Sequence, residues 1–249
     1  SDRGSHAAEV RVDDITSTSA TLRLQEPNNL DGRHYMETVN YMVVEAGTWV
    51  LPDGTLIEAG SVDTDRVYGN GFEAIEFQAD FGERPVIMSQ VQTSNDADFV
   101  TTRQKAATSD GFKMVMQKEE ALNGAGHAWE TLGWVAIEQG VSQLDELTFE
   151  AGSVVLPKQG FRTKMGTDLS FNDSLGANAF AMAKMASLHG GDTAWVRGTT
   201  AALGADLGVW IDEDTSLDAE RAHLGEIIDY IAFSDADLVL GSAYDELLF

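Results

Sequence analysis

The chain has 249 residues, 43% of them hydrophobic, which is enough apolar material for one large core or two ordinary ones. Its 41 acidic and 16 basic residues give a formal net charge of −25. Such a surface repels nucleic acid and anionic lipid, and no apolar run approaches the roughly 20 residues of a membrane helix. We therefore expect neither a nucleic-acid partner nor membrane insertion. The absence of cysteine excludes disulfides, thiolate zinc sites and cysteine nucleophiles.

The acidity suits a salty or calcium-containing medium, in which counter-ions screen the repulsion between carboxylates. We therefore expect the protein to be secreted or displayed at a cell surface. The alternative, that acidity only keeps the protein soluble, stays open at this point.

The first 54 residues contain HYMETVNYMVVE at 34–45, which reads His, two residues, Glu and then a largely apolar run. The same pattern returns as HAWETLGWVAIE at 127–138 and as HLGEIIDYIAFS at 223–234. Recurrence of this kind indicates an internal repeat. We interpret each copy as the closing strand of a small β-sandwich.

Residues between these copies show the pattern of antiparallel strands. The segments 83–93 and 97–108 are rich in β-forming residues. The segment 109–117 opens on the turn dipeptide Asp110-Gly111 and then alternates in polarity. Strands at roughly 10-residue spacing, separated by short loops of Gly, Asn and Asp, predict an all-β sandwich.

Two later stretches, 177–188 and 214–233, have the composition of helices. The repeat overlays the first on the strand segment 83–93, and the second on a loop followed by the strand at 129–138. We therefore predict strands in both places.

Landmarks recur at a nearly constant spacing. Arg11 precedes Arg103 by 92 residues, and Arg103 precedes Arg197 by 94. The hexapeptide IEAGSV at 57–62 returns as FEAGSV at 149–154. The chain is thus predicted to hold tandem antiparallel β-sandwiches. The predicted divisions are a partial repeat at 1–54, a sandwich at 55–148 and a second, diverged sandwich at 149–249.

The middle unit resembles the H-type lectin domain of snail agglutinins and slime-mould discoidins. The resemblance rests on Arg84-Pro85-Val86, on Arg103 placed eight residues before Gly111-Phe112, and on Gly133–Glu138 in the final strand. It implies that each unit is an antiparallel sandwich of about six strands, which binds galactose-type sugars and usually assembles into trimers or hexamers. The last unit has Ala205-Asp206 in place of Gly111-Phe112, which puts its sugar binding in doubt.

In that family an arginine, an aspartate, a histidine and an aromatic residue hold the sugar. The resemblance implies that Arg103 takes the arginine position and that His127 and Trp129 are approximate equivalents of the histidine–aromatic pair. The repeat extends the prediction to the last unit. The candidate carbohydrate-binding residues are therefore Asp98, Arg103, His127, Trp129, Arg197 and His223.

Structural alternatives stand beside these assignments. An arginine in a strand can be a buried ion-pair partner instead of a donor to hydroxyls. Glu130 or Asp98 is then the expected partner of Arg103, and Asp192 that of Arg197.

His127 and Glu130 invite a metal site, but residues three apart on a strand point to opposite faces. We therefore expect no shared zinc ion, and expect the two side chains to fix the loop before the strand.

Enzyme motifs such as Gly-x-Ser-x-Gly, His-Glu-x-x-His and a phosphate-binding glycine loop do not occur. We therefore expect no catalytic activity and no cofactor. The acidic loops, such as 95–98 and 211–218, lack the spacing of a dedicated calcium loop, which leaves a loosely held surface calcium ion as the one cofactor to consider.

Two functions follow from these features. The first is a non-catalytic extracellular module that binds galactose-type or acidic polysaccharide glycans through shallow sites, with tandem units adding avidity. The second is a structural spacer or assembly domain of a large surface or filament protein, partnered by copies of itself in a trimer or array. An exposed aromatic beside Arg103 favours the first, whereas an ion-paired Arg103 and a buried Trp129 favour the second.

Overall fold

β-Strands make up nearly all of the regular structure. The computed structural model describes residues 4, 6–157, 167–172, 175–176, 179–198 and 206–234. In this part of the chain the elements are sixteen strands and one short 3-10 turn, η1 (Glu120–Leu122). The all-β prediction is confirmed.

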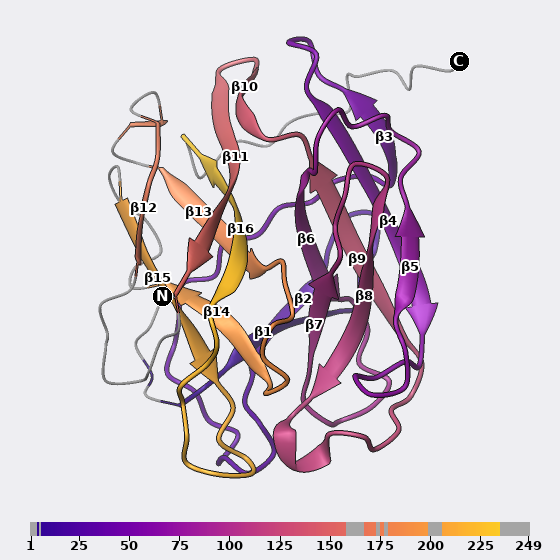
Figure 1. Ribbon diagram of the computed structural model, residues 1–249, viewed down its shortest axis with the longest axis vertical. Helices are drawn as coiled ribbons and strands as arrows, with labels where there is room; N and C mark the ends of the chain where they lie inside the picture. The colour runs from indigo at the N-terminus through magenta and orange to yellow at the C-terminus, as the bar shows by residue number, and fades with distance from the viewer. Residues whose placement is uncertain are drawn as a thin grey trace.

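Two β-sandwiches follow one another along the chain (Figure 1). The middle sandwich consists of β3 (Gly47–Val50), β4 (Leu56–Thr64), β5 (Glu73–Glu76), β6 (Val86–Val91), β7 (Val100–Lys105), β8 (Gly111–Lys118) and β9 (Glu130–Ile137). The last sandwich consists of β10 (Gly140–Leu144), β11 (Leu147–Leu156), β12 (Thr167–Ser170), β13 (Phe180–Met185), β14 (Ala194–Gly198), β15 (Asp206–Glu213) and β16 (Glu226–Phe233).

The two sandwiches have the same topology. In the middle sandwich a sheet of order β3-β4-β9-β6 is joined by a sheet of order β5-β8-β7. The last sandwich repeats this with β10-β11-β16-β13 and β12-β15-β14, and every pairing is antiparallel. One ancestral unit therefore accounts for both, with seven strands where about six were expected.

The stretches with helical composition are strands. β13 lies within 177–188, and β16 occupies the end of 214–233. β16 pairs on both sides, with β11 and with β13, so its backbone groups and apolar side chains are covered together. Ile228, Ile231 and Ala232 are fully buried there. Long-range pairing and burial outweigh local helix propensity in this segment.

The unit boundaries lie earlier than expected. β3 precedes residue 55 but pairs with β4, and β10 precedes residue 149 but pairs with β11. Each is the outer strand of the sheet that follows it. The units therefore begin near Gly47 and Gly140, because the motif at 57–62 and 149–154 marks a second strand.

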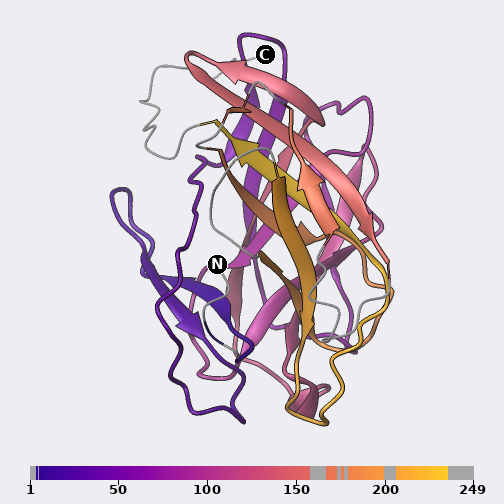
Figure 2. The same ribbon diagram turned by 90° about the vertical axis from the view of Figure 1, so that its left-hand side faces the viewer.

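The N-terminal segment forms a hairpin of β1 (Glu9–Asp13) and β2 (Thr21–Gln25). Sequence spacing makes it the equivalent of β7 and β8, as the partial-repeat prediction requires. In Figures 1 and 2 the hairpin lies in the lower half of the molecule beside both sandwiches. Arg11 donates to the Thr93 carbonyl of the middle sandwich at 3.0 Å, and Lys184 of the last sandwich reaches Glu9 at 3.0 Å.

The segment 34–45 corrects one expectation, because it belongs to none of the sheets. The closing strands β9 and β16 each pair with two strands from the first half of their own unit. The described residues before β3 contain no equivalents of those strands. The copy of the motif at 34–45 therefore has no neighbouring strands with which to pair.

A glycine–aromatic pair recurs in both large sheets. Gly60 of β4 lies opposite Trp134 of β9, and Gly152 of β11 lies opposite Tyr230 of β16. A Cβ atom added at Gly60 would stand 2.7 Å from the Trp134 ring, and one at Gly152 would stand 2.6 Å from the Tyr230 hydroxyl. The missing side chain thus makes room for the ring across the strand.

Gly60→Val is expected to lower the free energy of unfolding by about 1–3 kcal/mol, because the new side chain must displace Trp134 from its packed position. Urea unfolding followed by tryptophan fluorescence measures the change. Gly82→Ala is the control, since an added Cβ there meets nothing within 4 Å. Equal stability of the two variants would contradict the role given to the pair.

Candidate functional site

The first buried polar junction joins Arg103 of β7 to Glu226 of β16, across the two sandwiches. Val100 belongs to the core of the middle sandwich, so strand alternation puts Arg103 on the opposite face. There it is 0% exposed, with Nη2 3.1 Å from Glu226 Oε1. Nη1 donates to the Gln117 side chain at 2.7 Å and to the Asp192 carbonyl at 3.2 Å.

Several donors hold Glu226 in its charged form. It accepts the His189 backbone N–H at 3.0 Å and the Ser187 hydroxyl, and His223 Nε2 lies 3.2 Å away. Burial alone would raise its pKa, but the bonds from His223 and Ser187 and the charge of Arg103 lower the pKa of Glu226 to about 2. Burial also lowers the pKa of Arg103, to about 10, against the opposing effect of Glu226, so both groups are ionised at neutral pH.

A second junction repeats this arrangement between the hairpin and the middle sandwich. Arg11 Nη2 lies 2.8 Å from Glu130 Oε1, and both side chains are buried. Arg11 Nη1 donates to Gln25, the equivalent of Gln117. Glu130 accepts the Thr93 hydroxyl at 2.5 Å, and His127 Nε2 lies 3.2 Å from it.

A third junction joins the last sandwich back to the N-terminal segment. Arg197 of β14 places Nη2 3.5 Å from Glu37 Oε1. Its Nη1 donates to the His6 carbonyl at 2.7 Å and lies 3.3 Å from Asp212 Oδ2. Glu37 also accepts the Gly4 backbone N–H at 3.0 Å.

The three junctions together close a ring. The N-terminal segment supplies an arginine to the middle sandwich, the middle to the last, and the last to the N-terminal segment. Each glutamate belongs to the recurring His-x-x-Glu motif, and each histidine bonds to its own glutamate. The motif therefore supplies the carboxylate that pairs with the arginine of a neighbouring unit.

The arginine partners differ from those expected. Arg103 pairs with Glu226 and not with Glu130 or Asp98, and Arg197 pairs with Glu37 and Asp212, not with Asp192. The expected partners lie in the same unit, whereas Arg103 and Arg197 each reach into a neighbouring one.

The structure separates the six candidate carbohydrate-binding residues. Arg103, Arg197 and His223 are buried in junctions, where they face protein atoms and not solvent. His223 and Arg103 both bond to Glu226, in the first junction. His127 bonds to Glu130, in the second junction. Asp98 is half-buried and bonds to Lys118 at 2.5 Å.

Trp129 behaves differently from the other candidates, because its side chain is 60% exposed. Because Arg103 is buried and ion-paired whereas Trp129 is exposed, the two features that were to distinguish glycan binding from a spacer are mixed. The ion-paired Arg103 favours the spacer, and the exposed Trp129 favours the binding module.

The geometry also corrects the expectation for His127 and Glu130. They do not point to opposite faces, because His127 lies in the loop before β9 and its ring turns back onto the carboxylate. Glu130 holds the loop before β9 through His127, and it also fixes a loop that was not expected, between β6 and β7, by accepting the Asn95 and Asp96 backbone N–H groups at 3.1 and 3.3 Å.

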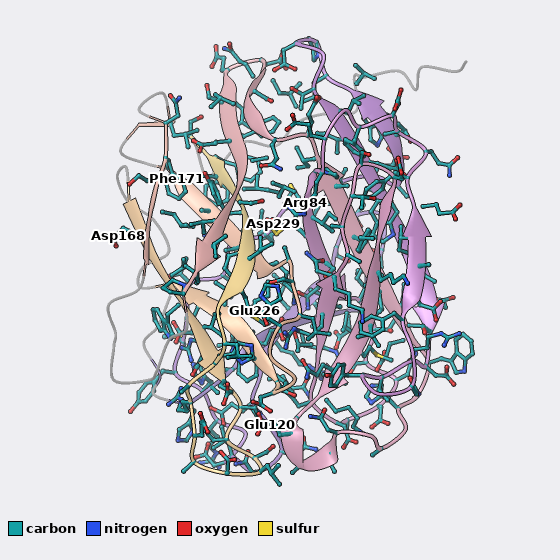
Figure 3. All side chains as sticks on the ribbon, viewed as in Figure 1. Arg84, Glu120, Asp168, Phe171, Glu226 and Asp229 are labelled. Carbon is teal, nitrogen blue, oxygen red and sulfur yellow. The ribbon has the colours of Figure 1, made fainter. Side chains whose placement is uncertain are left out.

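Further up the seam between the sandwiches, Arg84 and Asp229 form another junction (Figure 3). Arg84 Nη2 lies 2.7 Å from Asp229 Oδ2, which also accepts the Ile87 backbone N–H at 2.8 Å. Apolar residues of both sandwiches pack around this level: Leu51, Val86, Ile137, Leu144, Phe149, Ala151 and Ile231. The sandwiches thus share a core as well as ion pairs.

Among the residues that the structure describes, three groups of side chains have the geometry to hold a metal ion. They are His6, Glu26 and Asp31; Asp96, Asp98 and His127; and Glu120, Asp192 and Glu213. In each group one potential ligand atom per residue lies within 4.8 Å of the others.

Sequence reasoning missed Arg11, Glu37 and Glu226 as functional residues. The signal was present, since Arg11 precedes Arg103 at the repeat spacing and Glu37 and Glu226 occupy one motif position. Spacing identifies equivalent residues, but it does not say which unit each of them contacts.

Fold and junctions define a tandem β-sandwich protein whose units are joined by buried ion pairs. No helix in the described part of the chain has the length and apolar character needed to span a membrane.

The chain is similar to halomucin from Haloquadratum walsbyi, with 32% identity over 241 residues. That match covers 95% of this chain and 2% of halomucin, so the chain spans a small fraction of its curated relative. No family model matches the chain. No solved structure matches it either.

Proposed function

We propose that this chain is a non-catalytic structural segment of a long extracellular protein, in which sandwich units are locked to their neighbours. The observation that carries the proposal is the burial of Arg103 against Glu226 of the neighbouring sandwich. A sugar-binding arginine must be reachable from solvent, whereas an arginine that joins units must be covered. Removing one partner of such a pair leaves an uncompensated buried charge, so the junction holds its units in one arrangement.

The similarity to halomucin supports this function. The match covers nearly the whole of this chain but a very small part of halomucin, so a module of this kind occurs within a far longer protein. Units joined by equivalent junctions suit such a setting, because the same connection can be repeated along a chain. The net charge of −25 supports a place outside the cell, in a medium whose ions screen the repulsion.

Carbohydrate binding is the second candidate, and the exposed Trp129 supports it together with the resemblance to H-type lectins. An exposed indole offers a flat apolar face for a pyranose ring. In this version the contact is made by Trp129 at the surface and not by the buried arginines.

A glycan array and a polysaccharide panel, probed with the wild-type chain and with Trp129→Ala, distinguish the two functions. The structural proposal predicts no saturable binding of the folded wild-type chain to galactose-type or acidic polysaccharides. Binding that Trp129→Ala removes without changing the melting temperature would overturn the proposal in favour of the lectin function.

A further inference from the structure

Three carboxylates meet at the lower end of the seam between the sandwiches, in a group that we call the carboxylate pocket: Glu120, Asp192 and Glu213. Glu120 comes from η1 of the middle sandwich, and Figure 3 shows it at the foot of the seam. Asp192 and Glu213 belong to the last sandwich, in the loop before β14 and at the end of β15. The pocket therefore draws ligands from both sandwiches.

Glu120 lacks a partner for its buried oxygen. It is 8% exposed, and its Oε1 has no hydrogen-bond partner although it is buried. Its backbone N–H is bonded to Asp214, which adds a further acidic neighbour. Asp214, Asp192 and Glu213 place further carboxylates around this buried side chain. The ionised form of a buried carboxyl group among other carboxylates is costly, and either a proton or a bound cation removes that cost.

The equivalent place in the middle sandwich carries such a cation within the chain. Strand register makes Lys118 the equivalent of Glu213. Lys118 pairs with Val100, and Glu213 pairs with Ala194, which is the repeat equivalent of Val100. Lys118 Nζ lies 2.5 Å from Asp98 Oδ2, and Asp98 is the repeat partner of Asp192.

The neighbouring unit completes the comparison. Asn28 of the N-terminal segment, the equivalent of Glu120, donates its side-chain N–H to Asp98 at 3.1 Å. The three equivalent positions in the middle sandwich thus carry an amide, a carboxylate and an ammonium group, whose formal charges cancel.

The equivalent place in the N-terminal segment also contains a basic group. His6, at the position of Asp192, has its Nδ1 3.3 Å from Glu26, at the position of Glu213. In the carboxylate pocket, Glu213 bonds to a basic side chain, that of His223, at 2.8 Å. The other ring nitrogen of His223 bonds to Glu226. His34 makes the same bond to Glu26, so His223 does not take the place of Lys118 or His6.

We propose that the carboxylate pocket binds a calcium-type divalent cation, which occupies the position that the Lys118 ammonium group takes in the middle sandwich. Calcium ions take about six to eight oxygen ligands, with carboxylates among them, and complete their shell with carbonyl groups and water. Because Glu120 and the other two ligands belong to different sandwiches, the ion links the two sandwiches at the lower end of the seam. This inference stands on the pocket and the repeat, and does not depend on the proposed function.

The test compares calcium binding by isothermal titration, and melting temperature, for the EDTA-treated wild-type chain at matched ionic strength. We expect one calcium ion per chain and a rise of several degrees in melting temperature at saturation. Glu120→Gln should weaken binding by at least about tenfold, since it removes the ligand shared across the seam. Glu146→Gln removes an exposed carboxylate in the turn before β11 and should leave binding unchanged.

Glu213→Lys provides the sharpest comparison, because it copies the arrangement around Lys118. This variant should melt higher than the wild type in EDTA and show no further rise with calcium. Absence of binding at millimolar calcium, or an equal calcium effect in the wild type, Glu120→Gln and Glu146→Gln, would overturn the proposal. If Glu213→Lys fails to fold, the difference in calcium binding between Glu120→Gln and Glu146→Gln still tests whether the carboxylate pocket is the calcium site.

Discussion

Arg103→Met is expected to lower the free energy of unfolding by about 3–5 kcal/mol, because it leaves Glu226 buried without its counter-charge. Methionine keeps much of the side-chain volume, so the loss reports the charge and hydrogen bonds more than a cavity. Both side chains of the pair are 0% exposed, and solvent screening therefore does little to soften the effect. Urea unfolding at moderate salt concentration measures it without the ionic strength of guanidinium.

The matched control is Arg66→Met, which removes an arginine bonded to Glu73 at 2.7 Å at the surface. The Arg66 side chain is 46% exposed, and exposed pairs typically contribute less than about 1 kcal/mol. Similar small losses in the two variants would contradict the view that Arg103 holds the sandwiches together. A large loss from Arg103→Met alone would support it.

Acid is expected to weaken the fold between about pH 4.5 and pH 2, through Glu130 and Glu226. Burial alone would raise the pKa of each, but bonds from the motif histidine and a hydroxyl, together with an arginine, lower the pKa of each to about 2. The folded-state pKa thus lies below the ordinary value of 4.5. Each carboxylate then contributes stability, on the order of 3 kcal/mol, that is present above that ordinary value and is lost as the pH falls toward 2.

The measurement is the free energy of unfolding at a series of pH values. Glu130→Gln should be less stable than the wild type at neutral pH and should show a shallower fall in acid, because one of the two titrating groups is gone. Glu146→Gln should reproduce the wild-type profile. A Glu130→Gln profile parallel to that of the wild type would exclude Glu130 from the acid response.

Repeat spacing predicted the all-β class and the likeness of the two sandwiches, but it wrongly predicted a closing strand at 34–45. Residues 226–233 have the composition of a helix, yet the alignment with 130–137 correctly predicted a strand, because both copies pair with the same neighbours in their sheets. Local propensity is a weaker guide here than position within a repeat.

The candidate site was harder to predict, for a physical reason. The partner of Arg103 is 123 residues further along the chain and belongs to another unit. Spacing reveals that Arg11, Arg103 and Arg197 are equivalent, but the packing of one sandwich on another depends on surfaces whose contacts are not encoded in a short motif. The prediction therefore placed every ion-pair partner within one unit, whereas Arg103 and Arg197 each also reach a glutamate of another unit.

The closed ring of junctions is tested most directly by a double-mutant cycle on Arg197 and Glu37, which join the last sandwich to the N-terminal segment across 160 residues of sequence. Arg197→Met, Glu37→Gln and the double variant are compared with the wild type by urea unfolding. The cycle removes the separate contribution of Asp212, which also pairs with Arg197. Ring closure predicts a coupling energy of about 1–3 kcal/mol between the two side chains. Strictly additive losses, with a coupling energy near zero, would show that the last sandwich and the N-terminal segment are not joined in this way.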